Sequence, residues 1–219
     1  MQASMLARYA LIFFVFCAVG CASVVPEAHP DRPVAVYVTD YGIHSSLLLP
    51  LDDGRFVEYA FGDWNYSTLN RCWPQDSFVA LFLSPQSAFG RRFIDAPRPG
   101  SQPTPIDPSP SHVQVVYASR ENVDRVEDTL ARRWRAGATQ VVHNKENDMD
   151  YVPDTEHYSL ANNCNHLTAR CLRDMGCDVH GLVVISKFQV SPPSKNVLDE
   201  ANTASSHSRK GIFAQAQAN

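Results

Sequence analysis

The apolar run near the N-terminus, YALIFFVFCAVG at residues 9–20, limits which part of this chain can fold as a domain. Arg8 precedes the run, which is too short to cross a bilayer as a helix and ends abruptly at small residues. A positive charge, an apolar stretch and small residues in this order are typical of an export signal rather than a core helix. We therefore predict that residues 1–21 are a signal segment and that the chain from about residue 22 folds outside the cytoplasm.

The end of the apolar run resembles a bacterial lipobox, in which the signal is removed and a cysteine becomes the lipidated first residue. Here Ala18, Val19 and Gly20 precede Cys21, although Leu is the usual first residue of the motif. The resemblance implies that Cys21 carries a palmitate-type lipid anchor, and Ala22 after it implies an outer-membrane lipoprotein facing the periplasm. An uncleaved anchor and an ordinary signal peptide are the alternatives.

The composition argues against a nucleic-acid partner. The formal net charge is -4 and the signs are interspersed, whereas phosphate binding calls for clustered Lys and Arg. The hydrophobic share of 44% in 219 residues is sufficient for the core of one globular domain with flanking pieces.

Proline-rich and polar segments mark the predicted domain boundaries. Residues 22–33 contain three prolines and are predicted to be a tether, followed by one domain over residues 34–192. Inside it, residues 95–111 contain six prolines and are predicted to be a surface loop that could act as a lid. Residues 193–219 are small and polar, which indicates a loose tail.

The apolar periodicity predicts an α+β domain in which an antiparallel sheet packs against helices. Two helices are predicted, from Ser119 to Gly137 and from about Asn163 to Met175. Strands are predicted at 34–40, 112–117, 139–144 and 182–190, with an element of uncertain type at 77–83. The runs 41–50 and 55–61 are predicted to form a hairpin, with His44 at the start of its first strand.

Cys164 lies in the first turn of the second predicted helix, where a thiol can be chemically active. The unpaired N–H groups and the positive dipole end of a helix stabilise a thiolate. Asn162 or Asn163 is suited to cap the helix, and Asn165 with the first-turn N–H groups could hold an oxyanion. The alternative is that Cys164 is simply part of the core, as buried cysteines often are.

Two further roles for the cysteines follow from spacing. Cys72, Cys164, Cys171 and Cys177 remain in an oxidising compartment, but Cys164 and Cys171 are separated by roughly 10 Å of helical rise, which a disulfide does not bridge. Other disulfide pairings stay open.

A second set of residues suggests a zinc site, namely Cys164 with His143, His157 and His166, but their spacings match no compact metal motif. We predict no metal and no cofactor.

The stretch YGIHSSLLLP, followed far downstream by NNCNH, resembles the circularly permuted NlpC/P60 branch of the papain-like fold. More closely, VYVTDYGIHSSLLLP, VEYAFGDWNYS and YSLANNCNHLTARCL resemble the bacterial lipoprotein family DUF2459 over about residues 34–190. The chain differs from that family at His166-Leu167, where Thr-Trp is common, and at Tyr59-Ala60-Phe61, where Phe-Gly-Trp is common.

The resemblance implies a papain-like domain with Cys164 as nucleophile and His44 as its base. Glu58 and then Asp63 are the candidates for orienting the imidazole, and hairpin register decides which side of the sheet Glu58 faces. The implied activity is that of a cysteine amidase, peptidase or acyltransferase acting on cell-wall (peptidoglycan) peptides or on lipids. The alternative is a non-enzymatic envelope lipoprotein that uses the same fold for binding or scaffolding.

Overall fold

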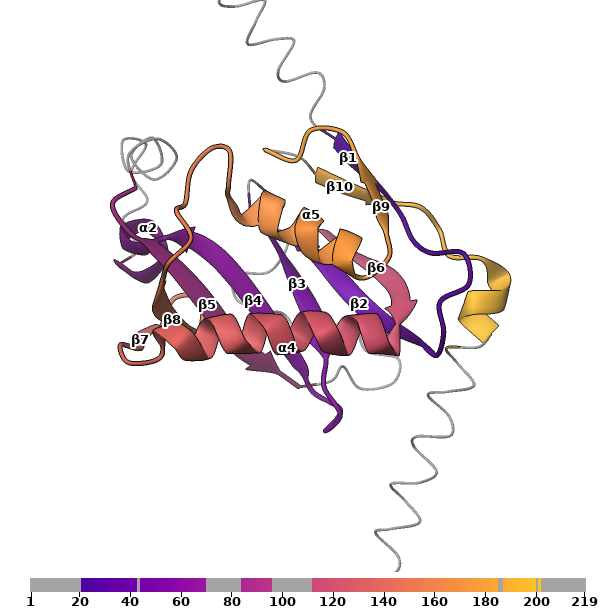
Figure 1. Ribbon diagram of the computed structural model, residues 1–219, viewed down its shortest axis with the longest axis horizontal. Helices are drawn as coiled ribbons and strands as arrows, with labels where there is room; N and C mark the ends of the chain where they lie inside the picture. The colour runs from indigo at the N-terminus through magenta and orange to yellow at the C-terminus, as the bar shows by residue number, and fades with distance from the viewer. Residues whose placement is uncertain are drawn as a thin grey trace, which may run out of the picture.

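A seven-stranded antiparallel sheet forms the centre of the protein, with the strand order β6-β2-β3-β4-β5-β8-β7 (Figure 1). The computed structural model describes residues 21–42, 44–69, 84–95, 112–184, 187–199 and 201. The strands are β2 (Pro33–Asp40), β3 (Ser45–Pro50), β4 (Phe56–Asp63), β5 (Ser87–Ile94), β6 (His112–Ser119), β7 (Val142–Asn144) and β8 (Met149–Asp154). Together with the helices, this sheet confirms the α+β prediction.

Two helices, α4 (Arg120–Gly137) and α5 (Cys164–Asp174), run across the same face of this sheet, while the short α2 (Trp64–Leu69) lies near β7 (Figure 1). Ser119 caps α4, since its side chain accepts a hydrogen bond from the backbone N–H of Asn122, as its type predicts. Gly176 follows α5 at a φ of +92°, a conformation that glycine adopts readily. Both helices were predicted from their apolar spacing and end points, and both predictions are confirmed.

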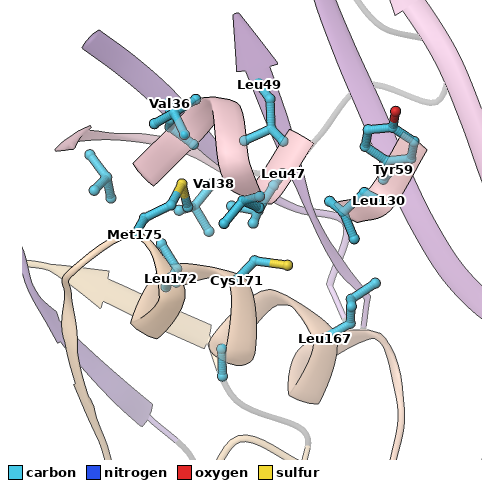
Figure 2. Close-up of a cluster of buried hydrophobic side chains, with 14 of the residues drawn as sticks. Val36, Val38, Leu47, Leu49, Tyr59, Leu130, Leu167, Cys171, Leu172 and Met175 are labelled. Atoms are coloured by element: carbon cyan, nitrogen blue, oxygen red, sulfur yellow. The ribbon is translucent and has the colours of Figure 1, made fainter. Parts of the chain in front are cut away.

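The hydrophobic core fills the space between the sheet and these helices (Figure 2). Side chains from three neighbouring strands meet side chains from both helices, because alternate residues of a strand point to one face. The residues labelled in Figure 2 are Val36, Val38, Leu47, Leu49 and Tyr59 from the sheet, Leu130 from α4, and Leu167, Cys171, Leu172 and Met175 from α5 and its end. The inward stripe of α5 thereby orients its first turn over the sheet.

A second, three-stranded sheet has the order β10-β1-β9, with β1 (Cys21–Val25) at its centre. β1 runs parallel to β10 (Lys187–Val190) and antiparallel to β9 (Asp178–His180). The prediction of a tether beginning at residue 22 is therefore wrong for its first residues. Ala22 and Val24 are fully buried, and the three prolines that suggested a tether all come after this strand.

Other boundaries also differ from the predictions. β5 and β8 were not predicted, because they contain the charged and glycine or proline residues that favour loops. The predicted tail begins with a helical turn at residues 195–199, in which Val197 is buried. Residues 1–20 of the predicted signal segment 1–21, the element at 77–83 and nearly all of the proline-rich loop lie outside the described residues. Within the described part of the chain, no helix is both long and apolar enough to span a membrane.

The strand β1 offers a test of whether residues 21–25 belong to the folded domain. Val24 is fully buried and its neighbour Val25 is 44% exposed, so the two residues form a matched pair. We expect Val24→Ala to lower the free energy of unfolding by about 2 kcal/mol, because it removes two buried methyl groups and leaves a cavity. Val25→Ala should change it little. Urea unfolding of the purified protein measures both variants. Equal losses of unfolding free energy would mean that residues 21–25 are a tether rather than part of the folded domain.

Candidate functional site

Cys164 is the first residue of α5, and the turn that precedes it is tightly held. Asn163 caps the helix, its side-chain oxygen accepting hydrogen bonds from the backbone N–H groups of Asn165 (3.1 Å) and His166 (3.3 Å). In return, the His166 ring accepts a hydrogen bond from the Asn163 N–H at 3.4 Å, which completes a capping box. Cys164 is only 4% exposed, so its thiol lies inside this ordered turn.

His44 immediately precedes β3, the strand against which the first turns of α5 pack. The two elements are joined by Ser45, whose hydroxyl donates to Asn165 Oδ1 at 2.7 Å and lies 3.1 Å from the Thr168 hydroxyl. This connection brings the neighbouring residues together, and the His44 imidazole hydrogen-bonds the Cys164 thiol. The pair predicted from the sequence is thus in contact.

The charges of this pair favour the ionised thiol. Burial raises the pKa of Cys164, but the His44 charge, its hydrogen bond, and the backbone N–H groups of Ser45 and Asn165 outweigh burial, so the pKa is lowered. Burial lowers the pKa of His44, but the Cys164 thiolate and the Glu58 charge outweigh it, so the pKa is raised. Opposite shifts in two touching groups are the electrostatic signature of a thiolate–imidazolium pair.

Glu58 lies on the face of the sheet opposite the helices. Its neighbour Tyr59 packs beneath α4 and α5, and successive side chains of a strand alternate between faces (Figure 2). On that opposite face Glu58 is 1% exposed and pairs with Arg92 Nε, directly across in β5, at 2.5 Å. Its other oxygen accepts hydrogen bonds from the hydroxyls of Tyr41 (2.9 Å) and Ser46. Glu58 therefore acts on His44 through its charge.

Tyr41 connects this buried ion pair to the imidazole. Its hydroxyl also accepts a hydrogen bond from Arg92 Nη2 at 2.9 Å, and its ring centroid is 6.0 Å from that of His44. Its backbone N–H donates to the carbonyl of His44 at 2.8 Å, closing a turn. Tyr41 is thus a positioning residue for His44 that the sequence analysis did not identify, because nothing in the sequence pairs it with Arg92.

The remaining predicted site residues have structural partners. Asp63 ends β4 and accepts hydrogen bonds from the Tyr66 N–H (2.9 Å) and the Ser84 hydroxyl (2.6 Å), so it serves the start of α2. The Asn165 side-chain nitrogen donates to the carbonyl of Val184 at 3.1 Å. The Asn165 side chain also lies at the sulfur, because the Cys164 thiol donates to its Oδ1 at 3.8 Å, and the Asn165 backbone N–H helps to lower the pKa of Cys164.

Tyr158 is a further residue at the site that the sequence did not reveal. Its hydroxyl hydrogen-bonds the Cys164 sulfur, and its pKa is raised by burial first and then by the Cys164 thiolate. Its ring packs edge-on against Phe61, with the centroids 5.2 Å apart. The residue comes from the irregular segment before α5, where no periodicity or motif spacing marks a functional side chain.

The other described cysteines behave differently. Cys171 and Cys177 are buried free thiols, and burial raises the pKa of each to about 12. Cys21 is free and exposed, and Cys72 lies outside the described residues. Among the described buried thiols, Cys164 alone has a lowered pKa. No cluster of His, Cys, Asp or Glu suited to a metal ion occurs in the described part of the chain.

Comparison of the chain with protein-family models, with curated proteins and with solved structures finds no match in any of the three. Assignment of a function therefore depends on the geometry and electrostatics of the site.

The buried Glu58–Arg92 pair yields a stability prediction. Arg92→Met leaves the Glu58 carboxylate buried without its cation, and we expect this to lower the free energy of unfolding by about 3–5 kcal/mol. The double variant Glu58→Leu/Arg92→Met should recover most of the loss, because no uncompensated charge remains. Chemical denaturation of the four proteins of this cycle measures the coupling. Additive losses would mean that the two side chains do not depend on each other.

Proposed function

We propose that this chain is an envelope-anchored cysteine hydrolase or acyltransferase that attacks an amide or ester carbonyl through Cys164. The observation that carries the proposal is the contact between the buried Cys164 and the partly buried His44, whose pKa values shift in opposite directions, lowered for Cys164 and raised for His44. A structural cysteine in the core has no need of a depressed pKa, as Cys171 on the same helix illustrates. Activated thiols of this kind are found in nucleophilic catalysis.

In the proposed reaction, the Cys164 thiolate forms a C–S bond to the carbonyl carbon, and the carbonyl π electrons move to oxygen. The hydroxyl of Tyr158 and the backbone N–H of Ser45, both near the sulfur, are suited to hold the resulting oxyanion, whereas the Asn165 N–H already donates to Asn163 Oδ1. The His44 imidazolium then gives its proton to the leaving amine or alcohol as the C–X bond breaks. Water or an acceptor alcohol, deprotonated by His44, releases the acyl group from the thioester.

The proposal extends to the fold family and the location. The order of a histidine at a strand start followed by a cysteine at a helix start, with that helix packed on an antiparallel sheet, supports a permuted papain-like domain of the NlpC/P60 type. The signal segment and Cys21 support lipid anchoring in a bacterial envelope membrane facing the periplasm. Cell-wall peptides and membrane lipids both contain carbonyl groups that such a site could attack.

The first test of the proposal is the pH dependence of Cys164 alkylation in the full chain in detergent, followed by mass spectrometry of the Cys164 peptide. We expect alkylation at neutral pH, below the midpoint near pH 8.5 that is typical of a free cysteine. Because the pKa of Cys164 is lowered by His44, the thiolate form persists as pH falls. His44→Ala should move the alkylation midpoint to higher pH, because burial raises the pKa of Cys164 and the His44 charge that lowers it is then gone.

His143→Ala is the matched control, because His143 is a half-exposed histidine in β7 that bonds Asp150. It should leave the alkylation midpoint unchanged. A Cys164 that is inert or oxidised in the wild type and indifferent to His44→Ala would contradict the enzymatic proposal. A non-enzymatic envelope lipoprotein would then be the better assignment.

Tyr158 gives a second test of the mechanism. Tyr158→Phe removes one donor from the site, and we expect the turnover of an activated ester to fall by about 100-fold. Tyr59→Phe is the control, because the Tyr59 hydroxyl is also partly buried but donates to Glu127. Steady-state ester hydrolysis measures both variants. An unchanged rate in Tyr158→Phe would assign its hydroxyl to packing rather than to the oxyanion.

A further inference from the structure

The start of β1 is joined to the segment that follows β9. His180, at the end of β9, pairs with Ser23, and Lys187, at the start of β10, pairs with Cys21. The chain between β9 and β10 thus leaves and returns at the Cys21 end of β1 (Figure 1). Gly181 lies so close to this end that a Cβ on it would come within 2.7 Å of the Cys21 carbonyl oxygen.

The same segment contacts the thiol site three residues later. The carbonyl of Val184 accepts hydrogen bonds from the side-chain nitrogens of Asn163 (2.9 Å) and Asn165 (3.1 Å), the residues on either side of Cys164. The four-residue segment 181–184 therefore contacts Cys21 at its first residue and the α5 cap at its last. The start of β1 and the first turn of α5 lie at the same end of the molecule.

The sequence before β1 indicates what lies next to this end. Residues 9–20 are apolar, and Cys21 follows them directly. This inference rests on the proposed anchoring: whether the stretch is kept as an anchor or replaced by a lipid on Cys21, the hydrophobic anchor then joins the domain at the first residue of a paired strand. No linker separates the anchor from the sheet, so the bilayer lies within about one residue length, roughly 3–4 Å, of this end.

The side chains at this end suit a lipid headgroup region. Leu182 is 43% exposed, and Lys187 and His180 are exposed beside it. Within the segments 21–23, 180–184 and 187–189, no Asp or Glu occurs. An exposed aliphatic side chain beside basic groups binds the boundary between acyl chains and anionic headgroups.

We propose that Cys21, residues 180–184 and Lys187 form a membrane-contact face that rests on the bilayer leaflet in which the chain is anchored. This face goes beyond attachment of the chain, because it fixes the orientation of the domain. It also holds the first turn of α5, with Cys164, at the level of the leaflet surface.

The test uses the full chain, expressed with its own signal and reconstituted into anionic phosphatidylglycerol vesicles with or without brominated acyl chains. Leu182→Trp adds a tryptophan to the face. Val141→Trp adds one at a similarly exposed residue (48%) that directly precedes β7, and β7 lies far from β1 in Figure 1. Brominated lipid should quench the added emission of Leu182→Trp and not that of Val141→Trp, after subtraction of the wild-type signal. Equal quenching of the two, or recovery of the protein in the soluble fraction, would overturn the proposal.

A charge variant tests the basic part of the face. Lys187→Glu in the Leu182→Trp background should reduce quenching by anionic vesicles and leave quenching by zwitterionic vesicles unchanged, because only the former attract Lys187. If Lys187→Glu left quenching by anionic vesicles unchanged, Lys187 would not belong to the face. Alkylation of Cys164 in detergent remains a separate measurement. A reactive thiol without quenching overturns only the contact face, and quenching with an inert thiol overturns only the proposed enzyme.

Discussion

The hydrogen bonds of Ser45 hold together the two halves of the site. Its hydroxyl bridges the start of β3 to Asn165 and Thr168 on α5, across 120 and 123 residues of sequence. All of these side chains are buried, so each bond is worth more than at the surface and each loss would leave an unsatisfied polar group. His44 and Cys164 are the immediate neighbours of these bonded residues. The contact between imidazole and thiol is therefore a consequence of how the helix is fastened to the sheet.

Position within the fold, rather than burial alone, decides the chemistry of the thiols. Cys164 and Cys171 share one stripe of α5 and are equally buried, at 4% exposed. Burial raises the pKa of Cys171 to about 12, whereas the pKa of Cys164 is lowered because His44 and two backbone N–H groups face its sulfur. Burial is the first cause of the raised pKa of Cys171, two turns along the same helix, whereas His44 and the Ser45 N–H lie at the first turn beside Cys164.

The sequence predicted the parts of the fold and site that depend on local patterns. The stripes of α4 and α5, the cap Asn163 and the pair of His44 with Cys164 all leave a signal in spacing or motif. Tyr41 and Tyr158 do not, because their roles arise from contacts between segments far apart in the chain. Neither Arg92 nor its strand β5 was predicted, because a charged residue argues against a buried strand. The charge is tolerated there only because Glu58 lies directly across from it. The register that places Glu58 there could not be read from the hairpin alone.

The strand β1 changes what the proposed site could reach. A flexible tether of the 12 residues predicted at 22–33 would let a domain move roughly 20 Å from its anchor. Pairing of Cys21 with Lys187 and of Ser23 with His180 removes that freedom, because the sheet begins at Cys21, the residue proposed to carry the anchor. With the α5 cap bonded to Val184, the proposed contact face would keep the thiol at a nearly constant height above the leaflet. On that proposal, carbonyl groups at the membrane surface would be within reach of the thiol, and carbonyl groups farther from the membrane would have to come to it.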